Sequence, residues 1–128
     1  MAELHVELVA ADRKVWSGSA RIVIARTTEG DIGIEPGHIP VLAVLQSGPV
    51  TIRTTDGESV VAAVHGGFFS VAENKVSILA ELAELSTEID VARAEEALAR
   101  AAAGGEPDQD AEAQRRAETR LRAVGHVR

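Results

Sequence analysis

The sequence predicts an all-β N-terminal sandwich, mostly antiparallel, followed by a two-helix C-terminal hairpin. Apolar residues alternate with polar ones in short runs up to about residue 85, and turn signals separate these runs. After that point alanine and arginine become frequent and β-branched residues become rare. We therefore predict a β-sandwich domain over residues 1–85 and a helical hairpin over residues 86–128.

The alternation also predicts which side chains fill the sandwich. In "ELHVELVA" apolar residues occupy every second position, which places them on one face of a strand. The run "RIVIART" is mostly apolar, which is typical of a strand covered on both faces. We expect the inward-facing set to include Leu4, Val6, Leu8, Ile22, Ile24, Ile52 and Ile78.

Two dipeptides predict hairpins between the later strands. Asp56-Gly57 separates "PVTIRTT" from "SVVAAVH" and favours a type I′ turn, which needs positive φ at both central residues. Glu73-Asn74 separates "FFSV" from "KVSILAEL" and is a second hairpin candidate.

The first helix is expected in "STEIDVARAEEALARAAAGG". Ser86 or Thr87 can cap its free amides, and Gly104-Gly105 is expected to end it. One face carries a narrow stripe of small apolar residues, Val91, Ala94, Leu98 and Ala101.

The second helix is expected in "AEAQRRAETRLRAV", after an acidic linker in which Pro107 acts as a helix stop. Its apolar face is Ala113, Ala117, Leu121 and Val124; Arg116 and Arg120 flank this face, and Arg115 and Arg122 point away from it. Residues 113–128 hold five arginines against one glutamate, which indicates either an acidic partner surface or a solvated face. Short alanine-rich helices need the sandwich, each other or a partner for stability.

Composition argues against several classes of function. The net charge of −7 and the aromatic content of 2% are unfavourable for binding nucleic acid. The chain has no cysteine, and its four histidines lack metal-ligand spacing, so no metal site is expected. The N-terminus does not resemble a signal peptide and no apolar run approaches the ~20 residues of a membrane span, so we expect a soluble, cytoplasmic protein.

No catalytic constellation is apparent either. His65-Gly66-Gly67-Phe68 is similar to the oxyanion loop of lipases, but the chain has no G-x-S-x-G motif. We interpret the segment as a glycine pair at a strand start or a bulge, and we expect no enzymatic activity from this chain alone.

One segment carries a family resemblance. "TTEGDIGIEPGHIPVL" resembles the E-G-x-x-G-I-x-P-G-H-x-P-L segment of the epsilon subunit of the F-type ATP synthase, in a form most similar to actinobacterial ones. The order of "ELHVELVAADRKVWSG", "GGFFSV", "KVSILAELAE" and "EIDVARAEEAL" agrees, so that the resemblance covers nearly the whole chain. It departs from the family pattern at Val41-Leu42, where another apolar pair is usual.

The resemblance implies a non-catalytic central-stalk subunit that couples proton-driven rotation to ATP synthesis and restrains ATP hydrolysis. The sandwich would bind the gamma subunit and sit on the c-ring, through Glu29 and Asp31, with His38 in the same segment. Asp31 is the better candidate of the two acids. Such a subunit would lie peripherally at the cytoplasmic face of the plasma membrane and reach the membrane only through the synthase complex.

The helical segment would be regulatory. Ile89-Asp90-Val91-Ala92-Arg93-Ala94 matches the family's nucleotide motif I/L-D-x-x-R-A, and Glu84 matches an upstream acid, so regulatory ATP could bind near Glu84, Asp90 and Arg93. No cofactor is required. Arg115, Arg116, Arg120 and Arg122 would meet an acidic segment of the catalytic beta subunit.

Two alternatives to these roles stay open. From the residues alone, Asp90 and Arg93 form an ordinary helix start with a surface ion pair. The alternative for the whole chain is a free-standing β-sandwich protein-binding module with a helical tail.

Overall fold

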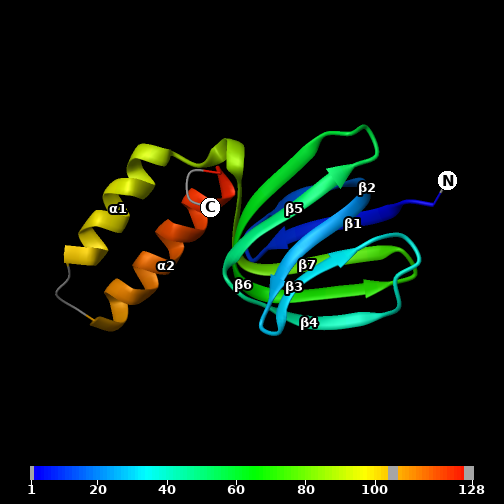
Figure 1. Ribbon diagram of the computed structural model, residues 1–128, viewed down its shortest axis with the longest axis horizontal. Helices are drawn as coiled ribbons and strands as arrows, with labels where there is room; N and C mark the ends of the chain where they lie inside the picture. Colours follow the sequence, from blue (N-terminus) through cyan, green and yellow to red (C-terminus); the bar gives the residue numbers. More distant parts are fainter. Residues whose placement is uncertain (1, 104–106, 126–128) are drawn as a thin grey trace.

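The computed structural model describes residues 2–103 and 107–125, which form a β-sandwich with a helical hairpin beside it (Figure 1). The elements in order are β1 (Leu4–Ala10), β2 (Lys14–Thr27), β3 (Gly30–Ile34), β4 (Val41–Leu45), β5 (Gly48–Thr54), β6 (Ser59–Ala72), β7 (Lys75–Leu85), the 3₁₀ turn η1 (Ser86–Glu88), α1 (Val91–Ala103) and α2 (Pro107–Ala123). The predicted fold class is confirmed, and no helix interrupts the strands between residues 20 and 80.

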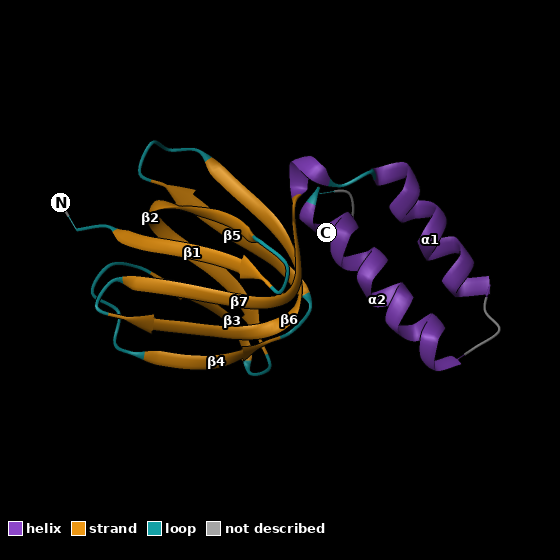
Figure 2. Cartoon of the chain, turned by 180° about the vertical axis from the view of Figure 1, so that it is seen from behind, coloured by secondary structure: helices purple, strands orange, loops and turns teal. Residues whose placement is uncertain are grey.

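The two layers of the sandwich share their longest strands. β6 pairs with β5 through its first half and with β4 through its second half, and β2 likewise pairs with β1, β5 and β3 along its length. All pairings are antiparallel except the parallel pair of β1 and β7. Figure 2 shows these strands wrapping around a common interior, with the hairpin at one end.

The core consists mainly of aliphatic side chains, as predicted. Five of the seven expected residues are fully buried: Leu4, Val6, Leu8, Ile52 and Ile78. The expectation for Ile22 and Ile24 was wrong, because Val23 and Ala25 face the interior instead. β2 is apolar on both faces and its register with β5 shifts between Ala20 and Ile22, and a shift of one residue exchanges the two faces.

Both predicted hairpins exist, but the turn type at the first was wrong. Between β5 and β6 only Gly57 has positive φ (87°), and its N–H donates to the Thr54 carbonyl at 3.1 Å. This is a type I turn closed by a glycine bulge. The turn with two positive φ values is the other one, at Glu73 (51°) and Asn74 (63°).

The glycine pair is neither at a strand start nor at a bulge. Gly66 and Gly67 lie inside β6, whose register with β7 is the same before and after them. They mark the point where β6 passes from β5 to β4. A Cβ on Gly67 would lie 2.1 Å from the Leu79 carbonyl oxygen, so this close approach requires glycine.

Both helices begin at residues other than those expected. Ser86 and Thr87 belong to η1, and the N-cap of α1 is Asp90, whose Oδ1 accepts from the Arg93 N–H at 3.0 Å. Pro107 does not stop a helix but begins α2, where its missing N–H costs no hydrogen bond. α1 ends at Ala103, and the predicted Gly104-Gly105 stop lies outside the described residues.

α2 is the helix next to the sandwich. It packs against β5 and β6 on one side and against α1 on the other, so that α1 forms the outer layer (Figures 1 and 2). Ala117 and Leu121 are buried in this arrangement, as are Ala94 and Ala101 of α1. Within the described residues, no helix is long and apolar enough to cross a membrane.

Candidate functional site

A cavity of about 420 Å³ lies between the end of β7, α1 and the last turn of α2. It is lined by Glu84, Glu88, Ile89, Asp90, Arg93, Ala94, Ala97, Arg100 and Arg120. The structure therefore places all three residues predicted for nucleotide around one cavity. It adds Arg100, which the sequence did not single out, and Arg120, for which we expected another role.

Backbone geometry positions the acids of this cavity. Glu84 is the second-last residue of β7, and its Oε1 accepts a hydrogen bond from Arg120 Nε of α2 at 2.6 Å. Asp90 is fixed by its capping bond. Both carboxylates thus have partners within the chain, and the Glu84–Arg120 pair joins the sandwich to the second helix.

A third acid is held by a corner of the sandwich. Glu88 Oε1 accepts from Arg13 Nη2 at 2.9 Å and from the Leu85 N–H at 3.0 Å. The Arg13 hydrogen bond, followed by that of the Leu85 amide, lowers the pKa of Glu88. Among the described side chains, Arg93 and Arg100 have no ion-pair partner. The cavity therefore carries cationic groups that an anion could bind.

His65 is a functional candidate that sequence reasoning missed. It is 7% exposed, and its Nε2 lies 3.3 Å from Glu84 Oε1, on the same oxygen that binds Arg120. Burial lowers the pKa of His65, the Arg120 charge lowers it further, and Glu84 opposes both. The sequence drew attention to this segment only through its glycines, and no local spacing links His65 to a partner on a helix 55 residues later.

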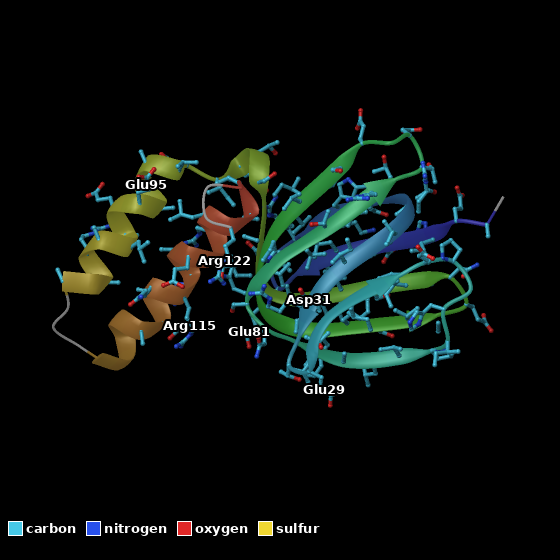
Figure 3. All side chains as sticks on the ribbon, viewed as in Figure 1. Glu29, Asp31, Glu81, Glu95, Arg115 and Arg122 are labelled. Atoms are coloured by element: carbon cyan, nitrogen blue, oxygen red, sulfur yellow. The ribbon has the colours of Figure 1, made fainter. Side chains whose placement is uncertain are left out.

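The residues predicted for docking do not gather at one place. Glu29 lies in the β2–β3 turn, and Asp31 follows it in β3, with a 67% exposed side chain and Arg26 Nε at 3.3 Å (Figure 3). His38 lies in the β3–β4 loop, separated from Glu29 by the length of β3. Its Nδ1 is 2.7 Å from the Ile39 carbonyl oxygen.

The four arginines of α2 have different environments. Arg120 binds Glu84, Arg116 lies 3.1 Å from Glu112, and Arg122 lies 3.9 Å from Glu118. Arg115 is exposed. Arg115 and Arg122, which we expected to point away from the apolar face, line a groove with Arg26 and Ser47 of the sandwich. Both arise from the helix nearest the sandwich (Figure 3).

One outer face of the sandwich is apolar and exposed. Val44 of β4 pairs with Phe68 of β6, which pairs with Leu79 of β7, so that the three side chains lie side by side. They are 48%, 55% and 53% exposed, and Leu42 on the same face of β4 is 78% exposed. We call Leu42, Val44, Phe68 and Leu79 the apolar strip.

Comparison with known proteins decides the family. Residues 3–86 match the family model described as "ATP synthase, Delta/Epsilon chain, beta-sandwich domain". The chain belongs to this ATP synthase delta/epsilon family. It is 70% identical over 123 residues to an ATP synthase epsilon chain of Streptomyces avermitilis, covering 96% of each chain, and 54% identical over 125 residues to that of Rhodococcus jostii, covering 97% of this chain and 98% of the relative.

Solved structures share the fold of this delta/epsilon-family chain. It superposes with a TM-score of 0.76 on a chain from a structure of the Euglena gracilis mitochondrial ATP synthase (OSCP/F1/c-ring), at 23% identity, over 98% of this chain and 79% of that one. The predicted resemblance to epsilon subunits, and to actinobacterial ones in particular, is thereby confirmed.

Proposed function

We propose that the chain is a non-catalytic central-stalk subunit of the F-type ATP synthase that couples proton-driven rotation to ATP synthesis and restrains ATP hydrolysis. The observation that carries the proposal is the apolar strip. An exposed row of Phe, Leu and Val side chains on a regular sheet is unfavourable in a free protein and is typical of a protein-binding surface. Together with membership of the family, it favours permanent docking onto the gamma subunit.

Co-purification with gamma tests this role. Phe68→Asp places a charge in the centre of the strip and should abolish binding, while the exposed position leaves the fold intact. The matched control is Arg53→Asp, an exposed change on β5 outside the strip, which should bind normally. Normal gamma binding by Phe68→Asp would favour the alternative of a free-standing binding module.

The c-ring contact is assigned to the β2–β3 turn and the start of β3, where Glu29 and Asp31 are exposed, with His38 as a separate, second point of contact. Asp31→Arg should weaken coupling without unfolding the protein, because the side chain is 67% exposed and Arg26 is its one partner among the residues that the structure describes. Proton pumping in membranes that carry Asp31→Arg measures the effect. Unchanged pumping would count against the assignment.

A regulatory nucleotide, ATP, is assigned to the cavity between the hairpin and β7. A volume of about 420 Å³ falls within the usual range for a small ligand. Arg93 and Arg100 can bind phosphate, and Glu84 and Asp90 can accept hydrogen bonds from ribose or base. Because the cavity has walls from β7 and both helices, bound ATP would hold the hairpin against the sandwich.

Calorimetry with millimolar ATP tests this assignment. Arg93→Gln should reduce affinity by about tenfold or more, the usual loss for one charged hydrogen bond. The control is Arg53→Gln, far from the cavity along the chain and exposed on β5. No heat of binding in the unaltered chain would exclude ATP while leaving the coupling role intact.

The brake on hydrolysis is assigned to the arginines of α2, which would meet an acidic surface of the catalytic beta subunit after the hairpin leaves the sandwich. The charge reversal is best made at Arg115 and Arg116. Changing Arg120 would also disturb the docked hairpin, because Arg120 binds Glu84 there. Reversing both to Glu, or deleting residues 106–128, should relieve inhibition in the reconstituted complex. Inhibition should also weaken as salt rises. Equal hydrolysis rates with and without this segment would refute the brake.

A further inference from the structure

One carboxylate is shared by two side chains at the junction between the sandwich and α2. Glu84 Oε1 accepts from Arg120 Nε at 2.6 Å and lies 3.3 Å from His65 Nε2. His65 comes from β6, Glu84 from β7 and Arg120 from α2, so that the three residues join three elements. The imidazole is buried, and its Nδ1 has no hydrogen-bond partner among the described residues.

We propose that His65 is a proton-sensitive latch for the hairpin: with a neutral ring the charge of Glu84 is balanced by Arg120 alone, and protonation of the ring weakens the docking of α2 on the sandwich. A neutral imidazole with its proton on Nε2 donates to Glu84 and adds no charge. A protonated ring adds a buried cation that competes with Arg120 for one oxygen.

The charges around the ring favour the neutral form while α2 is docked. On the helix side lie Arg120 and Arg116, with Arg115 and Glu112 beside a cavity of about 310 Å³ that His65 also lines. On the sheet side lie Glu84 and, at the same cavity, Glu81 of β7, whose position Figure 3 shows near α2. Arg116 is itself engaged with Glu112 at 3.1 Å, which leaves Glu84 as the main counter-charge for both His65 and Arg120.

The sign of the pH dependence follows from these surroundings. Burial and the charges of Arg120 and Arg116 lower the pKa of His65 in the docked state below its ordinary value, and both arginine charges would leave with α2 on undocking. A lowered histidine pKa means that the docked state is favoured above pH 6.5 and loses stability as the pH falls below it. The ratio of undocked to docked hairpin should rise at most about tenfold between pH 7.5 and pH 5.5.

Energy transfer between two dyes on the full chain tests the latch. The chain has no cysteine, so Asp56→Cys and Ala111→Cys provide two exposed attachment points, one on the sandwich and one on α2. At pH 7.5 we expect a single transfer efficiency, that of the docked hairpin. As the pH falls to 5.5, a second efficiency from undocked hairpins should grow. His65→Gln, which keeps a neutral donor for Glu84, should stay docked across this range.

A control variant and a second measurement complete the test. His5→Gln removes a histidine on β1 whose side chain is 56% exposed, and it should leave the pH response unchanged. If His65→Gln does not dock at pH 7.5, NMR titration of the unaltered chain replaces it: the α2 amide signals should shift with the same midpoint as the His65 ring. A response that persists in His65→Gln, differing midpoints, or no response in the unaltered chain would overturn the proposal. Because only the isolated chain is used, these outcomes are independent of whether it binds gamma.

Discussion

The sandwich and the helical hairpin are held together in different ways. Large side chains such as Leu8, Phe69 and Ile78 are fully buried in the sandwich, where each strand is bonded to at least one neighbour. Among the described hairpin residues, only Leu121 is a fully buried large side chain, and the other buried positions are mainly alanine. Polar pairs such as Glu84–Arg120 complete the contact.

This difference sets the energies of the two parts. Burying one leucine contributes roughly 1.5–3 kcal/mol and burying an alanine much less, so that the hairpin docks with a small fraction of the apolar stabilisation that holds the sandwich. The sandwich can therefore stay folded while the hairpin changes position. Four substitutions test this contrast, in order of decreasing effect.

The largest effect is expected from Phe69→Ala, which opens a cavity in the sandwich core. Phe69 is 0% exposed, and the change should lower the free energy of unfolding by about 3–5 kcal/mol. Urea denaturation followed by circular dichroism measures this loss. The neighbouring Phe68→Ala is the matched control: its side chain is 55% exposed in the apolar strip, so its cost should be below about 1 kcal/mol.

Leu121→Ala should affect the hairpin without affecting the sandwich. The side chain is 2% exposed, and its loss should weaken docking by roughly 2–3 kcal/mol. Hydrogen exchange should accelerate in α2, while the urea midpoint of the strands stays unchanged. Leu42→Ala, on an exposed position of β4, should alter neither measurement. Simultaneous loss of both parts would show that they unfold as one unit.

Arg120→Ala removes the main polar contact of the hairpin. The side chains of Arg120 and Glu84 are 26% and 25% exposed, and the loss in docking free energy should be about 1 kcal/mol after allowance for solvent screening. The pKa of His65 should rise at the same time, because the Arg120 charge lowers it. The control is Arg116→Ala, whose pair with the 67% exposed Glu112 is a surface contact worth about 0.3 kcal/mol. Equal losses from the two variants would contradict the assigned role of Glu84.

The sandwich was also the part that the sequence predicted better. Period-two alternation identified Leu4, Val6 and Leu8 because each lies on a strand with one polar face. It failed at Ile22 and Ile24, where both faces are apolar and alternation cannot set the register. Pro107 was misplaced for a related reason, since proline can either end a helix or begin one.

The candidate site could be predicted only where its residues are close in the sequence. Asp90 and Arg93 share one motif, and the resemblance supplied Glu84 upstream of it. Arg120 and His65 reach the same cluster from α2 and β6, and no local pattern reports contacts between elements so far apart along the chain. The structure was needed to show that Arg120 binds Glu84 when the hairpin is docked.

The smallest effect is expected from Arg13→Gln, at the bond between the β1–β2 corner and η1, where the hairpin segment begins. Arg13 Nη2 lies 2.9 Å from Glu88 Oε1, and both side chains are substantially exposed, at 44% and 41%. Overall stability should therefore hardly change.

The pKa of Glu88 should rise toward its ordinary value but stay below it, because the Leu85 N–H still donates to the same carboxylate. A carboxyl group with a lowered pKa stabilises the fold at pH values above the ordinary pKa of the group, and this stabilisation is lost as the pH falls through the lowered pKa. The variant should therefore lose a small contribution to stability that the unaltered chain has near neutral pH and loses in acid. NMR titration of the Glu88 carboxyl measures the shift, with Arg21→Gln on the exposed side of β2 as the control. An unchanged Glu88 titration in Arg13→Gln would mean that the Leu85 amide alone sets it, and that the sandwich corner does not anchor the start of the hairpin segment.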